Sequence, residues 1–275
     1  VEIAASLIKV VKKLSPLRVR NSDIRAVEVA TAKAFPGIEH TWADGGQWLM
    51  RAGDGITERS NSAAPLGTSA GFDAVPLDEI AAFYARHDLP VRLLIPERIG
   101  APAEKLINAG GWDLGPEIIV MTRSLTDVPE VNAGDLSFRI DDQPDADWLD
   151  LYHFRGRALP VHALELLREQ IDGRMGFARL LTQNGETVAI TRGTLTESGD
   201  GRRWLGYSAV EVAAAYRRRG LGTRLGQEML HWGATSGADG AYLQVIASNA
   251  AGRALYTKLG FVEHHRHRYA EQVAS

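Results

Sequence analysis

The feature that most constrains this chain is a strand that runs through a glycine-bearing turn into a helix, at residues 212–223. Apolar residues follow the turn at intervals of three or four, as in an amphipathic helix: Leu221, Leu225, Met229 and Trp232. The start of a helix leaves N–H groups unpaired and carries partial positive charge, so it favours a bound phosphate. Gly220 and Gly222 allow the backbone to approach such a ligand. The sequence therefore predicts an anion site at this turn.

The turn has the form Arg-x-x-Gly-x-Gly, from Arg217 to Gly222. It lacks the lysine and Ser/Thr of a nucleoside triphosphate loop and the Gly-x-Gly-x-x-Gly of a dinucleotide fold. It resembles motif A of the GCN5-related N-acetyltransferases (GNAT), whose loop wraps the pyrophosphate of coenzyme A. A basic surface turn before an ordinary helix is the alternative.

A second signature follows one helix and one strand later. The run 241–247 predicts a buried strand, and Asn249 then precedes a helix-forming run that ends at Gly260. Asn249 suits the N-cap of this helix, and Gly260 suits its left-handed end. With both motifs in order, the chain is identified as a member of the GNAT superfamily. The resemblance implies that Asn249 bonds the pantetheine arm and that Tyr256 faces the cofactor sulfur.

The resemblance implies acetyl-CoA as cosubstrate, with direct transfer to an amine. The cofactor-binding residues expected from it are Val210, Val212, Arg217, Arg218, Arg219, Gly220, Leu221, Gly222, Thr223, Asn249 and Arg253. It also implies that the backbone at 209–212 splays from the next strand and that an N–H there faces the developing oxyanion. Such a donor is worth about 3 kcal/mol.

Tyr256 is the candidate general acid for the departing thiolate. Proton transfer from a phenol of pKa near 10 to a thiolate near 8.5 is uphill by roughly 2 kcal/mol, which is tolerable if it accompanies C–S cleavage. The alternative role is that of a core tyrosine packed near Leu255 and Leu259.

Glu211 is the candidate general base, because it is the one carboxylate on the predicted strand 204–211. It can equally be solvated or paired with an arginine. His264, His265 and His267 on the last strand are alternative bases, since an imidazole accepts protons near neutral pH. Alternating histidines on an edge strand are usually exposed, and no carboxylate spacing supports a metal site there. The sequence predicts no metal.

The chain resembles itself at an offset of 149 residues, 103–112 matching 252–261. This predicts two tandem acetyltransferase-like domains, 1–130 and 131–275, with a hinge in the Pro- and Gly-containing stretch 125–135. The fold class expected is α/β (α+β), with two mixed, largely antiparallel sheets flanked by helices. In the first copy, 91–95 is an expected strand, 77–86 an expected helix and 117–123 the expected closing strand.

The first copy lacks the Arg-x-x-Gly-x-Gly loop, and Ile107 and Gly100 stand where the second copy has Tyr256 and Asn249. It is expected to serve as a scaffold, a substrate wall or a mimic of a partner subunit. Polar residues at 48–51 and 56–62 lie in a hairpin-like region and either contact substrate or reflect ordinary strand polarity.

The second copy is expected to contain strands at 136–140, 176–181, 187–194 and 203–212, helices at 147–155 and 162–171, and a hairpin turn at Asn184–Gly185. Acceptor residues are expected from 147–162, and these do not identify the acceptor.

Composition narrows the class of function. The chain has 275 residues, no cysteine and a formal net charge of −3, which excludes a cysteine nucleophile and disfavours nucleic acid as a partner. No apolar run reaches the 18 residues of a membrane helix, so a cytoplasmic enzyme is expected. The expected partner is a small-molecule or peptide amine, and the expected state a monomer or homodimer. A non-catalytic CoA-binding regulator and a transferase for longer acyl chains are the alternatives.

Overall fold

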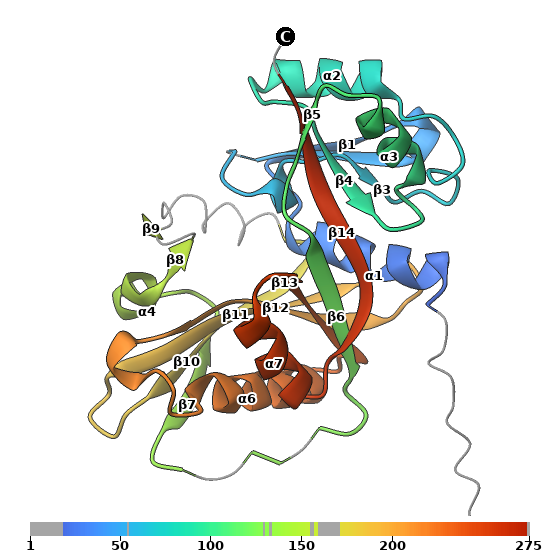
Figure 1. The fold of residues 1–275 in the computed structure, drawn as a ribbon. Coiled ribbons are helices and arrows are strands. Elements are labelled where there is room, and N and C mark those ends of the chain that lie inside the picture. The colour runs from blue at the N-terminus through green and yellow to red at the C-terminus, as the bar shows by residue number, and fades with distance from the viewer. Residues whose placement is uncertain are drawn as a thin grey trace, which may run out of the picture.

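The computed structural model describes residues 19–53, 55–128, 130–131, 134–154, 157–158 and 171–273 (Figure 1). The predicted helix at 162–171 lies almost wholly outside these residues, as does the N-terminal stretch. The elements form a small three-stranded sheet, a large nine-stranded sheet and a short pair of strands, β8 (His153–Phe154) and β9 (Arg157–Ala158).

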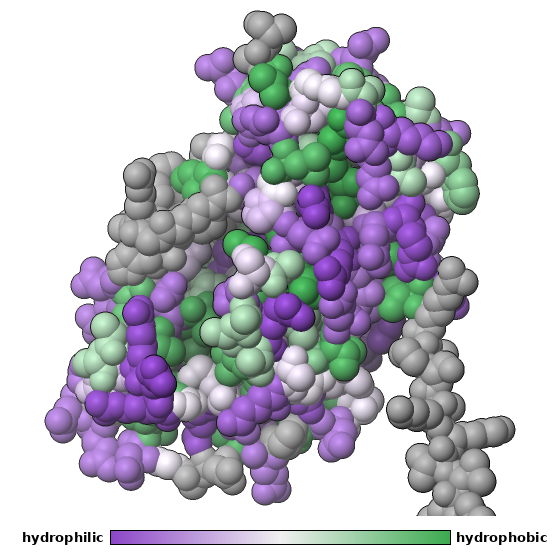
Figure 2. Space-filling view, viewed as in Figure 1, coloured by the Kyte–Doolittle hydropathy of each residue, from purple (hydrophilic) through white to green (hydrophobic). Residues whose placement is uncertain are grey.

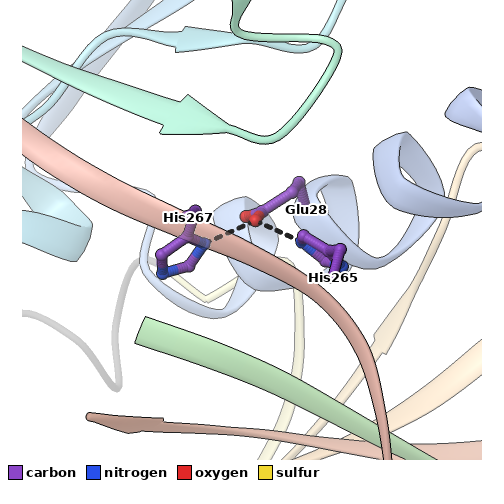
Figure 3. A group of neighbouring side chains, drawn as sticks. All are labelled: Glu28, His265 and His267. Carbon is purple, nitrogen blue, oxygen red and sulfur yellow. Dashed lines mark hydrogen bonds and ion pairs between the residues drawn. The ribbon is translucent and has the colours of Figure 1, made fainter. Parts of the chain in front are cut away.

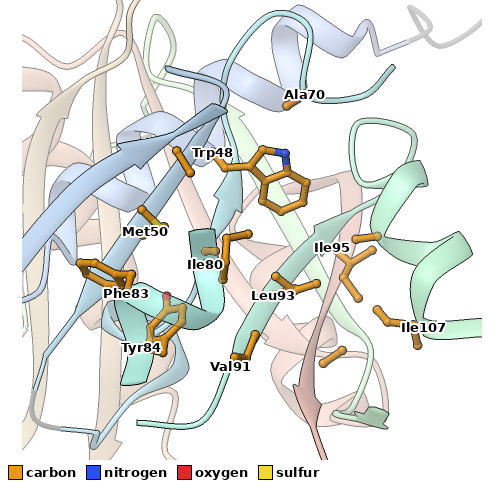
Figure 4. Packing of buried hydrophobic residues seen from close by; sticks show 14 of the residues in the cluster. Trp48, Met50, Ala70, Ile80, Phe83, Tyr84, Val91, Leu93, Ile95 and Ile107 are labelled. Carbon is orange, nitrogen blue, oxygen red and sulfur yellow. The ribbon is translucent and has the colours of Figure 1, made fainter. Parts of the chain in front are cut away.

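The small sheet belongs to the N-terminal half and has the order β1-β2-β3. Its strands are β1 (Glu39–Ala43), β2 (Trp48–Ala52) and β3 (Ala64–Pro65), with short 3-10 turns at Asp44–Gly46 and Glu58–Ser60. The helices α2 (Leu77–Arg86) and α3 (Ala101–Asn108) follow the expected positions. Trp48, Phe83, Tyr84 and Leu93 are each at most 1% exposed and lie in the core of this half (Figure 4).

The large sheet has the order β4-β14-β6-β13-β12-β11-β10-β7, with β5 paired to β14. Its strands are β4 (Arg92–Pro96), β5 (Trp112–Leu114), β6 (Ile118–Ser124), β7 (Ser137–Asp141), β10 (Gly173–Leu181), β11 (Thr187–Glu197), β12 (Arg203–Val212), β13 (Gly240–Ile246) and β14 (Val262–Gln272). Only the β12–β13 pair among these is parallel. The mixed, largely antiparallel α/β fold class is confirmed.

The strand expected to close the first copy has C-terminal strands as its neighbours. β6 lies between β13 and β14, in the half of the sheet that the C-terminal strands build. β14 in turn continues past β6 and pairs with β4 and β5 of the N-terminal half (Figure 1). The strand pattern of residues 117–123 predicts burial but carries no information on the neighbouring strand, so sequence alone could not reveal this exchange.

Helices cover both faces of the large sheet. On one face lie α1 (Asn21–Ala34) and α4 (Ala146–Leu151), and on the other lie α6 (Leu221–Thr235) and α7 (Ala250–Lys258). α1 comes from the N-terminal half, yet Ala30 O accepts a hydrogen bond from Thr196 Oγ1 at 2.9 Å, and Val27 packs against Trp204. The two halves therefore share a helix as well as strands, and the boundary at residue 130 stays a prediction.

The exposed face of β14 is hydrophilic (Figure 2). Arg266 and Arg268 extend from it to Glu117, and Arg266 also pairs with Glu263. The expected turn between β10 and β11 is present, but only Gly185 of the pair Asn184–Gly185 has a positive φ, at 82°. The α6 stripe is buried at Leu221, Leu225 and Met229 and only partly buried at Trp232.

Candidate active site

The glycine-bearing turn joins β12 to α6 through a 3-10 turn at Ala214–Tyr216. Gly220 is the N-cap of α6 and has a left-handed backbone, with φ of 80°. A Cβ at this position would meet no atom within 4 Å, so glycine is needed for the conformation and not for lack of space. Gly222 has a different role, because a Cβ there would lie 3.3 Å from Leu255 of α7.

The start of α6 has no side-chain cap. Within the described chain, the N–H groups of residues 221–223 have no backbone acceptor, so they are available to an anion. Arg217, Arg218 and Arg219 are exposed around them. Arg217 Nε donates to Val212 O at 3.0 Å, and the Arg219 guanidinium lies over the Tyr216 ring. Arg224 is instead paired with Glu228 at 2.7 Å.

β12 and β13 part beside this turn. Their parallel ladder has three pairs, of which the last joins Gly206 to Tyr242. From Tyr207 onward no described strand pairs with that side of β12, so the splay begins two residues earlier than expected. The ladder with β11 is also irregular here, because Ala209 forms a bulge with a φ of 59°.

The bulge determines which way the end of β12 faces. Ala209 packs near Trp148 on the α4 side, whereas Val210 and Val212 pack with the apolar face of α6. Because side chains alternate along a strand, Glu211 lies on the α1/α4 side of the sheet. Glu211 is half-buried and interacts with other groups of the protein.

α7 carries the second signature. Asn249 caps it, since its Oδ1 accepts from the Gly252 N–H at 2.9 Å, and Gly260 ends it with a φ of 83°. Both structural roles are confirmed. The cap occupies Asn249 Oδ1, which leaves the Nδ2 amide as its donor for a ligand. Arg253 is exposed and donates weakly to Ala247 O at 3.3 Å.

Tyr256 lies on α7 and faces β12. Its ring packs edge-on against Tyr207 at 5.9 Å and against Phe261 at 6.2 Å. Burial raises its pKa above the ordinary value of 10. Its hydroxyl has no hydrogen-bond partner among the residues that the structure describes, and Tyr207 Oη is likewise unpaired and fully buried. Tyr256 is thus both a packing residue and a hydroxyl without an internal partner.

A pocket lies on the other side of the splay. Its lining comes from α1, β11, β12, β13 and the N-terminal half: Thr31, Phe35, Arg59, Thr194, Gly206, Tyr207, Ser208, Tyr242, Leu243 and Gln244. Arg59 reaches it from the N-terminal half, where its Nε donates to Gln244 Oε1 at 2.7 Å. Of these residues, only Arg59 belongs to a segment in which the sequence suggested contact with substrate. The described residues of the expected acceptor segment 147–162 are not among those that line the pocket.

The other polar residues of 48–62 are structural. Arg51 is buried, and its guanidinium donates to Phe35 O and to Ser62 Oγ. Asn61 Oδ1 accepts from the N–H groups of Gly53 and Gly55. These contacts hold the loop that carries Arg59 in place.

Two histidines of β14 meet a carboxylate from α1 (Figure 3). Glu28 Oε1 lies 2.8 Å from His265 Nε2 and 2.6 Å from His267 Nδ1, and all three residues are about 1% exposed. The expectation of exposed histidines on an edge strand was therefore wrong. β14 is interior because β4 and β6 pair with it on opposite sides, and the carboxylate lies 237 residues before His265.

This Glu28–His265–His267 group has donor atoms within 4.8 Å of one another, as a divalent metal site requires. The same distances also arise without a metal, because both imidazoles are hydrogen-bonded directly to Glu28 Oε1. Burial opposes ionisation of Glu28, but the two histidines outweigh it and hold the carboxyl pKa well below its usual range. His264 neighbours the group, and burial lowers its pKa to about 4.

No helix in the described parts of the chain is long and apolar enough to cross a membrane. Over residues 21–270 the chain matches the family described as "Probable histone acetyltransferase Rv0428c C-terminal". It is 37% identical over 273 residues to the probable histone acetyltransferase Rv0428c of Mycobacterium tuberculosis, covering 98% of this chain and 80% of that protein. It is 26% identical to an uncharacterised N-acetyltransferase, YobR, of Bacillus subtilis, covering 90% of this chain and 98% of that protein.

Solved structures share the fold at low identity. A GCN5-related N-acetyltransferase from Kribbella flavida aligns with a TM-score of 0.65 at 15% identity, over 91% of this chain and 96% of its own. A tandem GNAT protein from the clavulanic acid biosynthesis pathway aligns with a TM-score of 0.60 at 16% identity, over 85% and 82%. The chain belongs to the Rv0428c C-terminal family of the GNAT superfamily and is an acetyl-CoA-dependent acyltransferase.

Proposed function

We propose that this chain transfers the acetyl group of acetyl-CoA directly to a primary amine of a small molecule or peptide. The observation that carries the proposal is the parting of β12 and β13 between Tyr256 and the pocket. A thioester on the Tyr256 side and an amine on the pocket side would meet at the unpaired backbone of β12. Reaction then needs proximity and an oxyanion donor and no covalent enzyme intermediate.

The turn before α6 fits the phosphates of the cosubstrate. Its left-handed Gly220, its unpaired N–H groups and three exposed arginines together favour an anion with several charges. In this proposal, Leu221, Gly222 and Thr223 donate backbone N–H groups, and Arg217, Arg218 and Arg219 supply charge. The pantetheine arm runs along the backbone of Val210 and Val212 to the Asn249 amide, with Arg253 at its side.

Tyr256 donates a proton to the departing sulfur. Its raised pKa makes full proton transfer to a thiolate more uphill than the roughly 2 kcal/mol of an ordinary phenol, so transfer accompanies bond cleavage. Glu211 takes the proton of the amine. Its position on the α1/α4 side of the sheet supports this role, because α1 also lines the pocket in which the amine is placed. His265 and His267 are less suited to this role, because Glu28 already binds a nitrogen of each and both are buried.

The alternative is a regulator that binds CoA without catalysis. Melting temperature with and without excess acetyl-CoA tests the site, and product analysis over an amine panel tests the chemistry. Ligand at 100 times its Kd stabilises by about 2.7 kcal/mol. Gly220→Glu should abolish this shift, whereas Gly201→Glu, at an equally open turn with φ of 81°, should keep it. A shift without any acetylated product supports the regulator, and no shift in the wild type contradicts both readings.

The peptide alternative has support in the name of the Mycobacterium tuberculosis relative, which describes a histone acetyltransferase. A monomer or homodimer without nucleic acid stays a prediction.

A further inference from the structure

Arg192 of β11 is a buried cation without an anion. It is 2% exposed, and within the described chain its guanidinium donates no hydrogen bond and forms no ion pair. Its Nε is buried and unpaired. An arginine keeps its charge in proteins, and a buried charge is costly unless it is paired. Burial accordingly lowers its pKa from the ordinary value.

The contact that the Arg192 guanidinium makes with the described residues is to an aromatic ring. Its guanidinium carbon lies 4.6 Å from the centre of Phe35, and that of Arg59 lies 5.1 Å from the same ring. Two guanidinium groups thus share Phe35, and their charges repel each other. A cation–π contact is worth less than a hydrogen-bonded ion pair, so the ring does not replace an anion.

Arg59 lines the pocket beside the splay, and Arg192 adjoins it through the ring of Phe35 without being one of its lining residues. Phe35 and Arg59 line it directly, and Thr194 on the same face of β11 as Arg192 lines it too. Neither a carboxylate nor a histidine is among the lining residues in the described parts of the chain. Gln244 Nε2 is a further buried donor without a partner, because its Oε1 is the atom that binds Arg59. The pocket therefore offers donors and positive charge to a ligand, and the described residues that line it supply no counter-ion.

We propose that Arg192 and Arg59 bind a carboxylate of the acceptor, so that the acceptor is a small amine that carries a carboxylate, of the amino-acid class. This inference rests on the proposed acetyl transfer, because it identifies the pocket with the acceptor site. Tyr207 lines the pocket and contacts Tyr256, which puts the anion and the thioester on opposite sides of β12. A basic peptide tail would meet the charge of the two arginines and be repelled.

Matched acceptors test the proposal. Thiol release from acetyl-CoA is measured with free amino acids, with their amides and with the corresponding decarboxylated amines. The carboxylated acceptor of each set should have a kcat/KM at least about 10-fold higher. In Arg192→Met this preference should disappear through a loss of about 100-fold for the carboxylated acceptor, with the amine unchanged within about 3-fold.

Further variants separate the charge from the fold. Arg192→Lys keeps the charge without the planar fork and should restore part of the preference. Arg59→Gln should weaken it independently. Arg202→Met removes an exposed arginine that also lies over an aromatic ring, Trp204, and should change nothing. An unchanged preference in a folded Arg192→Met protein would overturn the proposal.

A binding measurement distinguishes failure of the inference from failure of the proposed function. N-acetyl amino acids and N-acetyl amines are titrated by calorimetry into the protein with CoA. Selective binding of the carboxylated compounds that is lost in Arg192→Met supports the anion pocket. If such binding is found without any turnover, the anion pocket stands and the proposed transfer reaction is overturned. If amines are acetylated with no preference for those that carry a carboxylate, the carboxylate pocket is overturned and the proposed acetyl transfer stands. Better turnover of basic peptides than of amino acids also overturns it.

Discussion

Glu28 Oε1 on α1 and His267 Nδ1 on β14 lie 2.6 Å apart although 239 residues separate them in the chain. The contact joins the first described helix to the last strand, within the region where the halves exchange elements. It is fully buried, so its loss leaves polar groups unpaired inside the protein.

Removal of the Glu28 charge should destabilise the whole chain. Glu28→Gln keeps the volume but replaces two charge-assisted hydrogen bonds, and we expect a loss of about 2–3 kcal/mol in the free energy of unfolding. Urea denaturation measures it. Glu263→Gln is the control, because its pair with Arg266 is exposed and should contribute less than about 1 kcal/mol. Equal effects of the two variants would contradict a structural role of the Glu28–His265–His267 group.

Acid should weaken the fold below neutral pH. His264 has its pKa lowered to about 4 in the folded state, below the unfolded value near 6.5. Its contribution is present above pH 6.5 and is lost as the pH falls towards 4, because the unfolded chain binds the proton first. Glu28, whose pKa is also lowered, adds a loss below about pH 4.

The His264 contribution can be isolated by denaturation at several pH values. We expect the wild type to lose about 1 kcal/mol between pH 7 and pH 5, which is roughly half the loss for a fully buried ring because His264 is partly exposed. In His264→Gln the free energy of unfolding should change little between pH 7 and pH 5 and should still fall below pH 4. A profile of His264→Gln parallel to that of the wild type would assign the pH dependence to other groups.

Tyr256→Phe should reduce kcat by about 100-fold with little change in the KM for acetyl-CoA. The ring contacts with Tyr207 and Phe261 survive in this variant, so the melting temperature should stay within a few degrees. Tyr269→Phe removes a hydroxyl from β14, at a position packed against the N-terminal half, and serves as the control. If kcat is unaffected while acetyl-CoA still binds, Tyr256 is a packing residue and not the acid.

Glu211→Gln should lower kcat/KM for the amine by about 100-fold at pH 7, with recovery at higher pH as the free amine becomes neutral. The pH–rate profile is the measurement, since a lost fold or a lost cosubstrate site would lower the rate at every pH. Glu197→Gln, at the other end of the neighbouring strand β11, provides the comparison. A profile that keeps its shape would remove Glu211 from the mechanism.

The C-terminal half alone should not fold. A fragment of residues 131–275 lacks β6, which lies between β13 and β14, and lacks α1, which covers Trp204 and Tyr242. We expect it to aggregate or to lack a cooperative thermal transition, and to regain one when residues 1–130 are co-expressed. A stable, acetyl-CoA-binding fragment would show that the two predicted domains are independent.

The sequence by itself predicted the parts of this protein that depend on local order along the chain. The stripe of α6, the left-handed Gly260 and the Asn249 cap follow from residue spacing and from backbone preferences that act over a few residues. The family and the fold class followed from these motifs, because a phosphate-binding turn is a contiguous piece of chain.

Only the tertiary structure decided which distant segments meet. Strand patterning cannot specify a neighbour, so the place of β6 between β13 and β14 was missed, and with it the burial of His265 and His267. The ring of Phe35 likewise brings together Arg59 and Arg192 from two other elements. The effect of their charges and burial depends on the folded structure, because the interaction of two groups is set by their distance in space and not by their separation in sequence.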